Sequence, residues 1–240
     1  MLNMFLFALF TSLSALVSAV VGFAGALVAV PFITLFLPPK VAVPAFTMVI
    51  LVMQIAVIYE GRRHLCWSRI TVLTLAGVAG TLVGAFSLAH LPSGTIRIIV
   101  SAVTLGFGLL FLMKTPIRFS GGKFIEAAFG LLSGWLGGCI AQSGPPVVFL
   151  ALAQGWKKEA FRANLTAYFL VLNIIACLAY WKLDLFSTKG LKLSAVALVP
   201  ALLMLGLGLR IKNRVNETAF RSIVLAIIIL VGLAGLIPFG

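Results

Sequence analysis

The sequence predicts an all-α polytopic membrane protein made of two repeats that lie in opposite orientations in the bilayer. Of its 240 residues, 62% are hydrophobic and only 10% are charged, and the mean hydropathy is +1.20. A soluble domain of this length cannot bury so much apolar surface, so the chain requires the bilayer as its solvent. Each half of the chain also opens with a long uncharged segment interrupted by glycine and proline, a pairing typical of secondary transporters.

The first uncharged segment runs from Met4 to Leu37 and is interrupted at Gly22-Phe23-Ala24-Gly25 and again at Pro31. Glycine frees the backbone for a tight turn, whereas proline ends or begins a helix easily. We therefore expect a re-entrant helical hairpin over 4–37.

Three apolar runs follow the first hairpin between clusters of charged residues. A run of about 20 residues at 1.5 Å per residue is long enough to cross about 30 Å of hydrocarbon. Together with the hairpin they form the first predicted repeat, residues 1–115, whose spans are 41–59, 70–89 and 96–113.

The second uncharged segment, Ala127–Ala153, is interrupted from Gly134 to Pro146. It predicts a second hairpin over 122–153, and three further runs complete a second repeat, residues 120–240. Its predicted spans are 163–180, 191–209 and 219–238. The whole chain is then one transmembrane domain with eight hydrophobic segments, or about ten helices when the hairpin arms are counted separately.

Landmarks recur between the two halves and favour an internal repeat. The segment Gly22-Phe23-Ala24-Gly25 matches Gly134-Trp135-Leu136-Gly137, and Thr47 and Gln54 match Thr166 and Asn173.

The distribution of the 18 Lys and Arg residues decides the topology. If each interrupted segment crossed the membrane once, the two faces would receive equal numbers. If each segment returns to its own side, thirteen basic residues share one face, which the positive-inside rule makes cytoplasmic. The hairpins are therefore expected to return, the second repeat to be inverted, and both termini to lie outside. The basic residues left on the outer face are Lys40, Arg97, Lys182, Lys189 and Lys192.

The interruption in the second half has the chemistry of an anion site. Ser143-Gly144-Pro145-Pro146 predicts a cap, a turn and a helix start, and the amides and dipole at a helix start attract anions. Gly25-Ala26-Leu27 offers the same in the first hairpin. No Asp or Glu lies in the middle of a span, which argues against cation or proton handling. The predicted substrate-binding residues are Gln142, Ser143, Gly144, Gly138, Gly22, Gly25, Asn173 and Gln54.

Other classes of function lack the residues they need. The sequence shows no nucleophile with a base and no metal-ligand set at depth, so an enzyme, a cofactor and a metal site are not expected. The net charge of +13 follows from the positive-inside rule rather than from nucleic-acid binding. The expected partners are the lipid bilayer and a small anionic substrate, and a homo-oligomer is left open.

The second half resembles a known family. Its residues Gly134-Trp135-Leu136-Gly137-Gly138, Ser143-Gly144-Pro145-Pro146, Gln154-Gly155-Trp156-Lys157-Lys158 and Arg162-Ala163-Asn164 are similar to a motif of the TauE/SafE sulfite-exporter-like membrane proteins. The first half, with Gly22-Phe23-Ala24-Gly25, Pro31, Lys40 and Ala42, resembles a degenerate copy that departs from the motif at Ala24 and Ala26. The resemblance covers essentially the whole chain and implies a membrane transporter of sulfite, sulfonates and related anions.

The sequence thus predicts an exporter of small sulfur-containing anions such as sulfite or organosulfonates, bound at the midplane by two opposed helical breaks. The expected location is a bacterial or archaeal cell (inner) membrane. The inside-negative potential alone drives an anion outward by about 2.3 kcal/mol per charge per 100 mV, so uncoupled efflux is the simplest mechanism. The alternatives are transport of another small anion (thiosulfate or a carboxylate), transport of a cation or neutral solute, and a non-transport assembly role.

Overall fold

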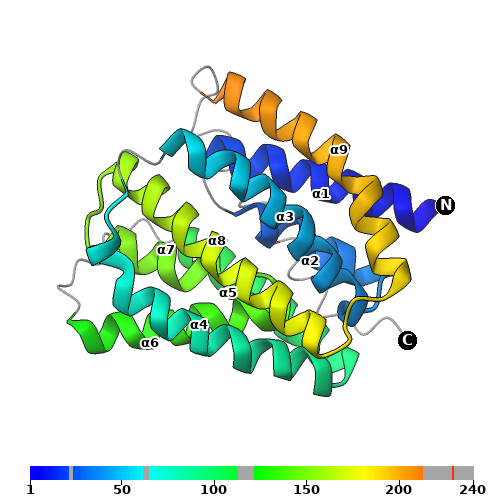
Figure 1. The fold of residues 1–240 in the computed structure, drawn as a ribbon, viewed down its shortest axis with the longest axis horizontal. Helices are drawn as coiled ribbons and strands as arrows, with labels where there is room; N and C mark the ends of the chain where they lie inside the picture. Colours follow the sequence, from blue (N-terminus) through cyan, green and yellow to red (C-terminus); the bar gives the residue numbers. More distant parts are fainter. Residues whose placement is uncertain (22–23, 62–64, 113–121, 213–228, 230–240) are drawn as a thin grey trace. The chain divides into compact units, whose positions relative to one another are not determined.

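The computed structural model describes the chain except for residues 22–23, 62–64, 113–121, 213–228 and 230–240. Within this described part the chain is entirely helical, without strands, which confirms the predicted all-α fold class (Figure 1). The described helices are α1 (Leu2–Val21), α2 (Gly25–Phe36), α3 (Pro39–Gly61), α4 (Trp67–His90), α5 (Ser93–Leu112), α6 (Lys123–Ile140), α7 (Gly144–Ala153), α8 (Lys158–Lys182) and α9 (Thr188–Ile211).

Six of these helices, α1, α3, α4, α5, α8 and α9, are long and apolar enough to cross a bilayer. Each predicted span from 41–59 to 191–209 corresponds to one helix, which begins two to five residues earlier than the apolar run. The helices are longer because Lys and Arg side chains at a membrane edge extend to water while their backbone stays helical. The last predicted span, 219–238, lies almost wholly outside the described residues.

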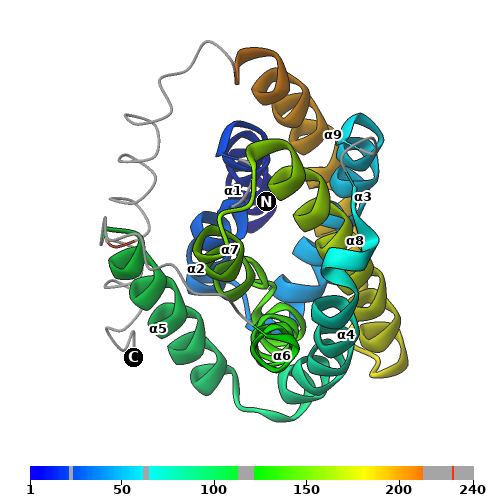
Figure 2. The same ribbon diagram turned by 90° about the vertical axis from the view of Figure 1, so that its left-hand side faces the viewer.

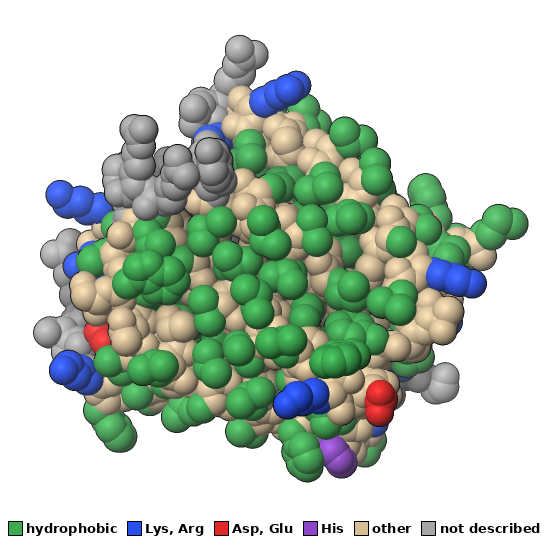
Figure 3. Space-filling model, in the orientation of Figure 1, with side chains coloured by type: hydrophobic (Ala, Val, Ile, Leu, Met, Phe, Trp, Pro, Cys, Tyr) green, Lys and Arg blue, Asp and Glu red, His purple; other side chains and the backbone are tan. Residues whose placement is uncertain are grey.

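The surface of these helices matches a lipid environment. Many large apolar side chains are exposed, among them Leu75, Leu82 and Phe86 on α4. Apolar side chains are spread across the face seen in Figure 3, and most of the Lys and Arg side chains lie toward its margins. Together with the six long helices, this makes the chain a polytopic membrane protein.

The chain folds into two compact units. Unit 1 contains Met1–Val49, Leu91–Lys114 and Phe186–Gly240, and unit 2 contains Ile50–His90 and Thr115–Leu185. Helix α3 contributes its first part to unit 1 and its last part to unit 2. Each unit therefore combines one hairpin with a helix from the other half of the chain.

In unit 1, α1 packs along α9, and both ribbon views show the two helices side by side (Figures 1 and 2). Gly208 of α9 allows this approach, because a Cβ there would lie only 2.6 Å from the Cβ of Ala19. Helices α1 and α2 form a hairpin, since the rings of Phe10 and Phe32 stack with centroids 4.5 Å apart. Val17 of α1 and Leu27 and Val28 of α2 form a buried hydrophobic cluster in this hairpin.

In unit 2, α4 and α6 pack closely along their lengths, and α8 packs on both helices. Glycines make the α4–α6 contact possible, since a Cβ at Gly134 would collide with the carbonyl oxygen of Gly77 and a Cβ at Gly138 with that of Thr81. Small residues at such positions let helix backbones approach in membranes.

Helices α6 and α7 also form a hairpin, because Gln154, just after α7, donates to the Glu126 carboxylate in the first turn of α6 over 3.4 Å. The rings of Phe129 and Phe149 stack between the two arms. A segment that crossed the membrane once could not make these contacts. Helix α7 therefore turns back along α6 in the structure.

Both predicted interruptions are partly wrong. Pro31 lies inside α2 and does not interrupt it. The sequence places the second interruption from Gly134 onward, but α6 continues to Ile140, and the interruption is only Ala141 to Ser143. Gly134 and Gly138 serve the helix contact with α4 rather than the turn. Periodicity alone does not separate a packing glycine from a breaking one.

Helix boundaries in the two halves recur at one separation. Gln54 and Asn173 are 119 positions apart, and the same separation relates the ends of the first hairpin arms, the starts of the second arms, and the starts of the next helices. These pairs are Val21 and Ile140, Gly25 and Gly144, and Pro39 and Lys158. At this separation Gly22-Phe23-Ala24-Gly25 no longer matches Gly134-Trp135-Leu136-Gly137.

Candidate functional site

The break of the second hairpin is a tight turn of three residues. Ala141 has a left-handed backbone with φ 54°, a conformation that costs energy for a residue with a Cβ. Its N–H donates to the Gly137 carbonyl over 2.9 Å, and the N–H of Gln142 donates to Leu136 over 3.3 Å. These bonds satisfy carbonyl groups that a helix end otherwise leaves unpaired.

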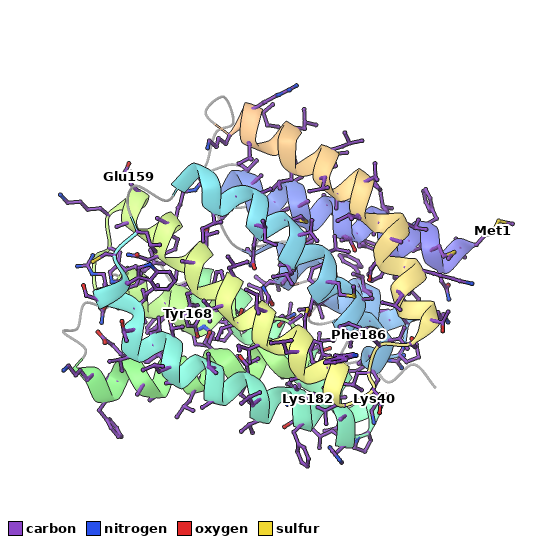
Figure 4. The ribbon with its side chains drawn as sticks, viewed as in Figure 1. Met1, Lys40, Glu159, Tyr168, Lys182 and Phe186 are labelled. Atoms are coloured by element: carbon purple, nitrogen blue, oxygen red, sulfur yellow. The ribbon has the colours of Figure 1, made fainter. Side chains whose placement is uncertain are left out.

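Side chains of α6 and α8 hold this turn in place. The Ser133 hydroxyl donates to the carbonyl oxygen of Ser143, and the Tyr168 hydroxyl donates to Ser133 Oγ over 2.9 Å. Tyr168, labelled in Figure 4, thus extends from α8 to α6 and is fully buried. About three turns further along α8, toward its C-terminal end, the Tyr180 hydroxyl donates to the Gly138 carbonyl over 2.7 Å. An unpaired buried polar group costs about 1–3 kcal/mol, so these bonds stabilise the turn.

The residues predicted to bind substrate in the second hairpin have different surroundings. Gln142 is fully buried, whereas Ser143 and Gly144 are partly exposed. Ser143 occupies the N-cap position of α7 as predicted, but its side chain makes no capping bond, so that part of the prediction is wrong. A Cβ at Gly144 would meet only Phe169 at 3.9 Å, so packing does not require glycine there. Gly138 is required by the contact with α4.

Gln54 and Asn173 meet in unit 2. The Asn173 amide Nδ2 donates to Gln54 Oε1 over 2.8 Å, which joins α3 to α8. Both side chains are partly buried. The sequence predicts them at matched positions of the two halves, and the structure places them in direct contact. Each amide keeps one further group, Gln54 Nε2 and Asn173 Oδ1, outside this bond.

The break of the first hairpin is built differently. Gly22 lies outside the described residues, whereas Gly25 begins α2 after Ala24, whose φ is 74°. Gly25 lies against α1, where a Cβ would collide with Ser18 Oγ and lie 2.6 Å from Ser14 Oγ. Ser14 Oγ and Thr11 Oγ1 are buried without a hydrogen-bond partner.

Polar residues of the family-like motif gather at one end of unit 2. The Arg69 guanidinium lies over the Trp156 ring, 5.4 Å from its centroid, and the Trp156 Nε1–H donates to Gln154 Oε1 over 2.8 Å. Asn164 Oδ1 accepts a bond from the Cys66 N–H over 2.8 Å and so ties α8 to the α3–α4 connection. Glu159, labelled in Figure 4, marks this end of α8 and Lys182 the other.

The exposed thiol of Cys66 lies in that connection, outside the spans. Its Sγ lies 3.3 Å from Ser68 Oγ, and this hydrogen bond, more than any other interaction, lowers the pKa of the Cys66 thiol. Within the described part of the chain, no three His, Cys, Asp or Glu residues gather as a metal site would need.

Sequence reasoning missed Ser133, Tyr168 and Tyr180 around the second break, and Thr11 and Ser14 beside the first. A tyrosine inside an apolar run was an available signal, because its buried hydroxyl needs a partner. Ser14 and Ser133 also stand at the separation of 119 that relates Gln54 and Asn173. Neither serine lies in an interrupted motif, which is why the motifs did not reveal them.

Comparison with known proteins adds independent findings. The family model "Sulfite exporter TauE/SafE" matches residues 6–235. A relative named probable sulfite/organosulfonate exporter TauE, from Cupriavidus necator, is 23% identical over 208 residues, which cover 84% of this chain and 81% of the relative. No solved structure matches the chain. The family model spans nearly all of the two units and both hairpins, and the chain therefore belongs to the sulfite exporter TauE/SafE family.

Proposed function

We propose that the protein exports sulfite or small organosulfonates across the cell membrane, and that the anion is bound where the two hairpins break. Membership of the TauE/SafE family carries this proposal, and the name of the Cupriavidus necator relative supports the substrate class. Transport rather than catalysis is the role that the family description gives. The residues proposed to contact the anion are those predicted from the sequence: Gln142, Ser143, Gly144, Gly138, Gly22, Gly25, Asn173 and Gln54.

The length of the second arm in each hairpin supports a site near the midplane. Helix α7 has 10 residues and α2 has 12, which at 1.5 Å per residue is about 15–18 Å, or roughly half of a 30 Å hydrocarbon layer. Each arm starts at its break and ends at a polar connection. Non-helical backbone at that depth is tolerated where protein or a water-filled path surrounds it.

An inverted repeat is supported by the exchange of helices between the units. The first arm of each hairpin packs on a helix from the other half of the chain, α1 on α9 and α6 on α4. Gln54 and Asn173 are equivalent at the separation of 119 and form a hydrogen bond. Equivalent positions are expected to touch only beside the axis that relates them, so this pair supports a two-fold relation between the repeats.

The end of unit 2 that carries Arg69, Trp156 and Cys66 is the proposed cytoplasmic end, with both termini outside. The Cys66–Asn164 hydrogen bond and the Arg69–Trp156 contact bring the α3–α4 and α7–α8 connections to the same end of unit 2. This supports one common side for their basic residues, as the positive-inside rule requires. A membrane-impermeant maleimide is expected to label Cys66 in inside-out but not in right-side-out vesicles, with Cys66→Ser as the background. Labelling only in right-side-out vesicles would reverse the orientation.

Flux from proteoliposomes tests the proposed function. Vesicles loaded with sulfite or methanesulfonate are expected to release the anion faster with the protein than without it, and faster still when the potential inside is negative. Thiosulfate, acetate and sodium ions provide the alternative substrates. Flux of sodium ions without flux of any sulfur anion would overturn the proposal.

A further inference from the structure

Two hydroxyl groups on α1 differ from the usual hydroxyl in these helices. Thr34, Thr47 and Thr81 each donate to a carbonyl of their own helix over 2.8–2.9 Å, which is the usual solution for a hydroxyl in a membrane helix. Thr11 Oγ1 and Ser14 Oγ make no hydrogen bond, although both side chains have an exposed fraction of 0%. A buried polar group without a partner is unfavourable, so a ligand that pairs with it gains affinity.

These hydroxyls lie on the side of α1 that carries the break of the first hairpin. Thr11, Ser14 and Ser18 are spaced three and four residues apart and share one face of the helix. Gly25, the first residue of α2, lies against Ser14 and Ser18. Ala24 supplies no side-chain cap to α2. The amides that begin a helix without a side-chain cap, and the positive end of its dipole, favour an anion.

In the second hairpin, the serine at the corresponding position has hydrogen-bond partners within the protein. Ser133 stands 119 positions after Ser14, the separation that relates Gln54 and Asn173, and it bonds to both Tyr168 and the Ser143 carbonyl. At that separation the residue that corresponds to Tyr168 is Val49, a buried side chain that cannot form a hydrogen bond. Ser14 is thus left open where Ser133 is paired.

The lack of acidic residues in the described part of unit 1 favours an anionic ligand. Its described residues, 1–21, 24–49, 91–112 and 186–212, contain no Asp or Glu. Ser14 Oγ lies against Gly25, the first residue of α2. Three further buried polar atoms without partners occur among the described residues: Thr74 Oγ1, Arg97 Nε and Asn164 Nδ2.

We propose that the two breaks are not equivalent, and that the first hairpin binds the oxygens of the transported anion through the Ser14 and Thr11 hydroxyls and the start of α2. This inference rests on the proposed function, because it assigns the ligand of that same site. The expected ligand class is a small oxyanion with several oxygens, such as sulfite or a sulfonate. At the second break the Ser133 and Tyr168 hydroxyls are already paired, so there the anion would meet the residues named under the proposed function and not these hydroxyls.

Binding of sodium sulfite and sodium methanesulfonate to the full-length protein in nanodiscs tests this assignment. Ser14→Ala is expected to weaken binding about 3- to 10-fold, and Ser14→Ala with Thr11→Val at least 10-fold. Ser14→Thr keeps the hydroxyl and should bind within about threefold of the wild type. Ser12→Ala is the matched control, because Ser12 is two residues away and already donates to the Ala8 carbonyl over 2.7 Å. It should bind like the wild type.

The outcomes separate the two proposals. Wild-type flux together with unchanged binding in Ser14→Ala and in the double variant overturns the first-hairpin site and leaves the exporter intact. Absence of both binding and flux of every sulfur anion in the wild type overturns the exporter as well. Equal loss in Ser12→Ala and Ser14→Ala, with altered melting of both proteins, also overturns the site. If the double variant does not purify, the comparison of Ser14→Ala with Ser14→Thr carries the test.

Discussion

The two hairpins have corresponding helix boundaries but satisfy their polar groups differently. In the second, the Tyr168 hydroxyl donates to Ser133 Oγ, and the Ser133 hydroxyl donates to the Ser143 carbonyl. In the first, Ser14 stands at the corresponding position with no partner, and Val49 replaces the tyrosine. The hydroxyl of Ser133 is thus satisfied by protein, whereas that of Ser14 is not. Two segments with corresponding helix boundaries can therefore differ in how they satisfy the same buried hydroxyl.

The largest expected effect concerns the helix contact that carries the second hairpin. Gly134→Val would force side-chain atoms into the Gly77 backbone, and we expect a loss of about 3 kcal/mol or more of stability, or no folded protein. Thermal melting and size-exclusion chromatography in detergent measure this loss. Gly106→Val is the control, because a Cβ at Gly106 meets nothing within 4 Å. Equal behaviour of the two variants would contradict the close α4–α6 contact.

The next effect compares the two serines directly. Ser133→Ala leaves the Tyr168 hydroxyl and the Ser143 carbonyl without their partner and should cost about 2 kcal/mol of unfolding free energy. Ser14→Ala removes a hydroxyl that has no partner, so without anion it should leave the melting temperature unchanged or raise it slightly. Melting curves in anion-free buffer decide the point. If both substitutions destabilise equally, the difference between the hairpins disappears.

A smaller effect is expected at the amide pair. Gln54→Leu and Asn173→Leu should be non-additive, with a coupling of about 0.6–1 kcal/mol between the two side chains. A double-mutant cycle on unfolding free energy measures this coupling. Thr47→Val with Asn173→Leu serves as the control pair, because the Thr47 hydroxyl bonds within its own helix. Additive effects for Gln54 and Asn173 would mean that the bond contributes nothing.

The smallest effect is at the polar end of unit 2. Because hydrogen bonding to Ser68 lowers the pKa of Cys66, and the thiolate is the reactive form, labelling of Cys66 by maleimide should reach half of its maximal rate at a lower pH than for an ordinary thiol. Ser68→Ala should move this midpoint to higher pH. An unchanged midpoint would show that the serine does not stabilise the thiolate.

Much of the fold was predictable because the bilayer imposes simple rules. Uncharged length predicted membrane spans, and six of the described helices are long and apolar enough to cross a membrane. The count of basic residues predicted hairpins rather than simple crossings, and Gln154 after α7 contacts Glu126 at the start of α6. The helix ends were less predictable, since Lys123 and Lys158 continue their helices beyond the apolar runs.

The candidate site was predictable only in part. The motif located the turn at Gln142 and Ser143, and matched positions identified Gln54 and Asn173, but not that these two amides bond to each other. Ser14 and Ser133 gave no local signal, because a serine in an apolar run usually bonds to its own helix. Ser133 has a partner because Tyr168 stands on α8, whereas the corresponding residue for Ser14 is Val49. Both of these residues are far from their serine in the sequence.

The interlocking glycines of α4 and α6 have a mechanical consequence. Because backbone meets backbone at Gly77 and Gly134 and again at Thr81 and Gly138, neither helix can slide or roll along the other without steric collision. Helix α4 comes from the first half of the chain and α6 from the second. We therefore expect α4 and α6 to move together as one rigid pair in any rearrangement, so that a helix of the first half of the chain stays coupled to a helix of the second half.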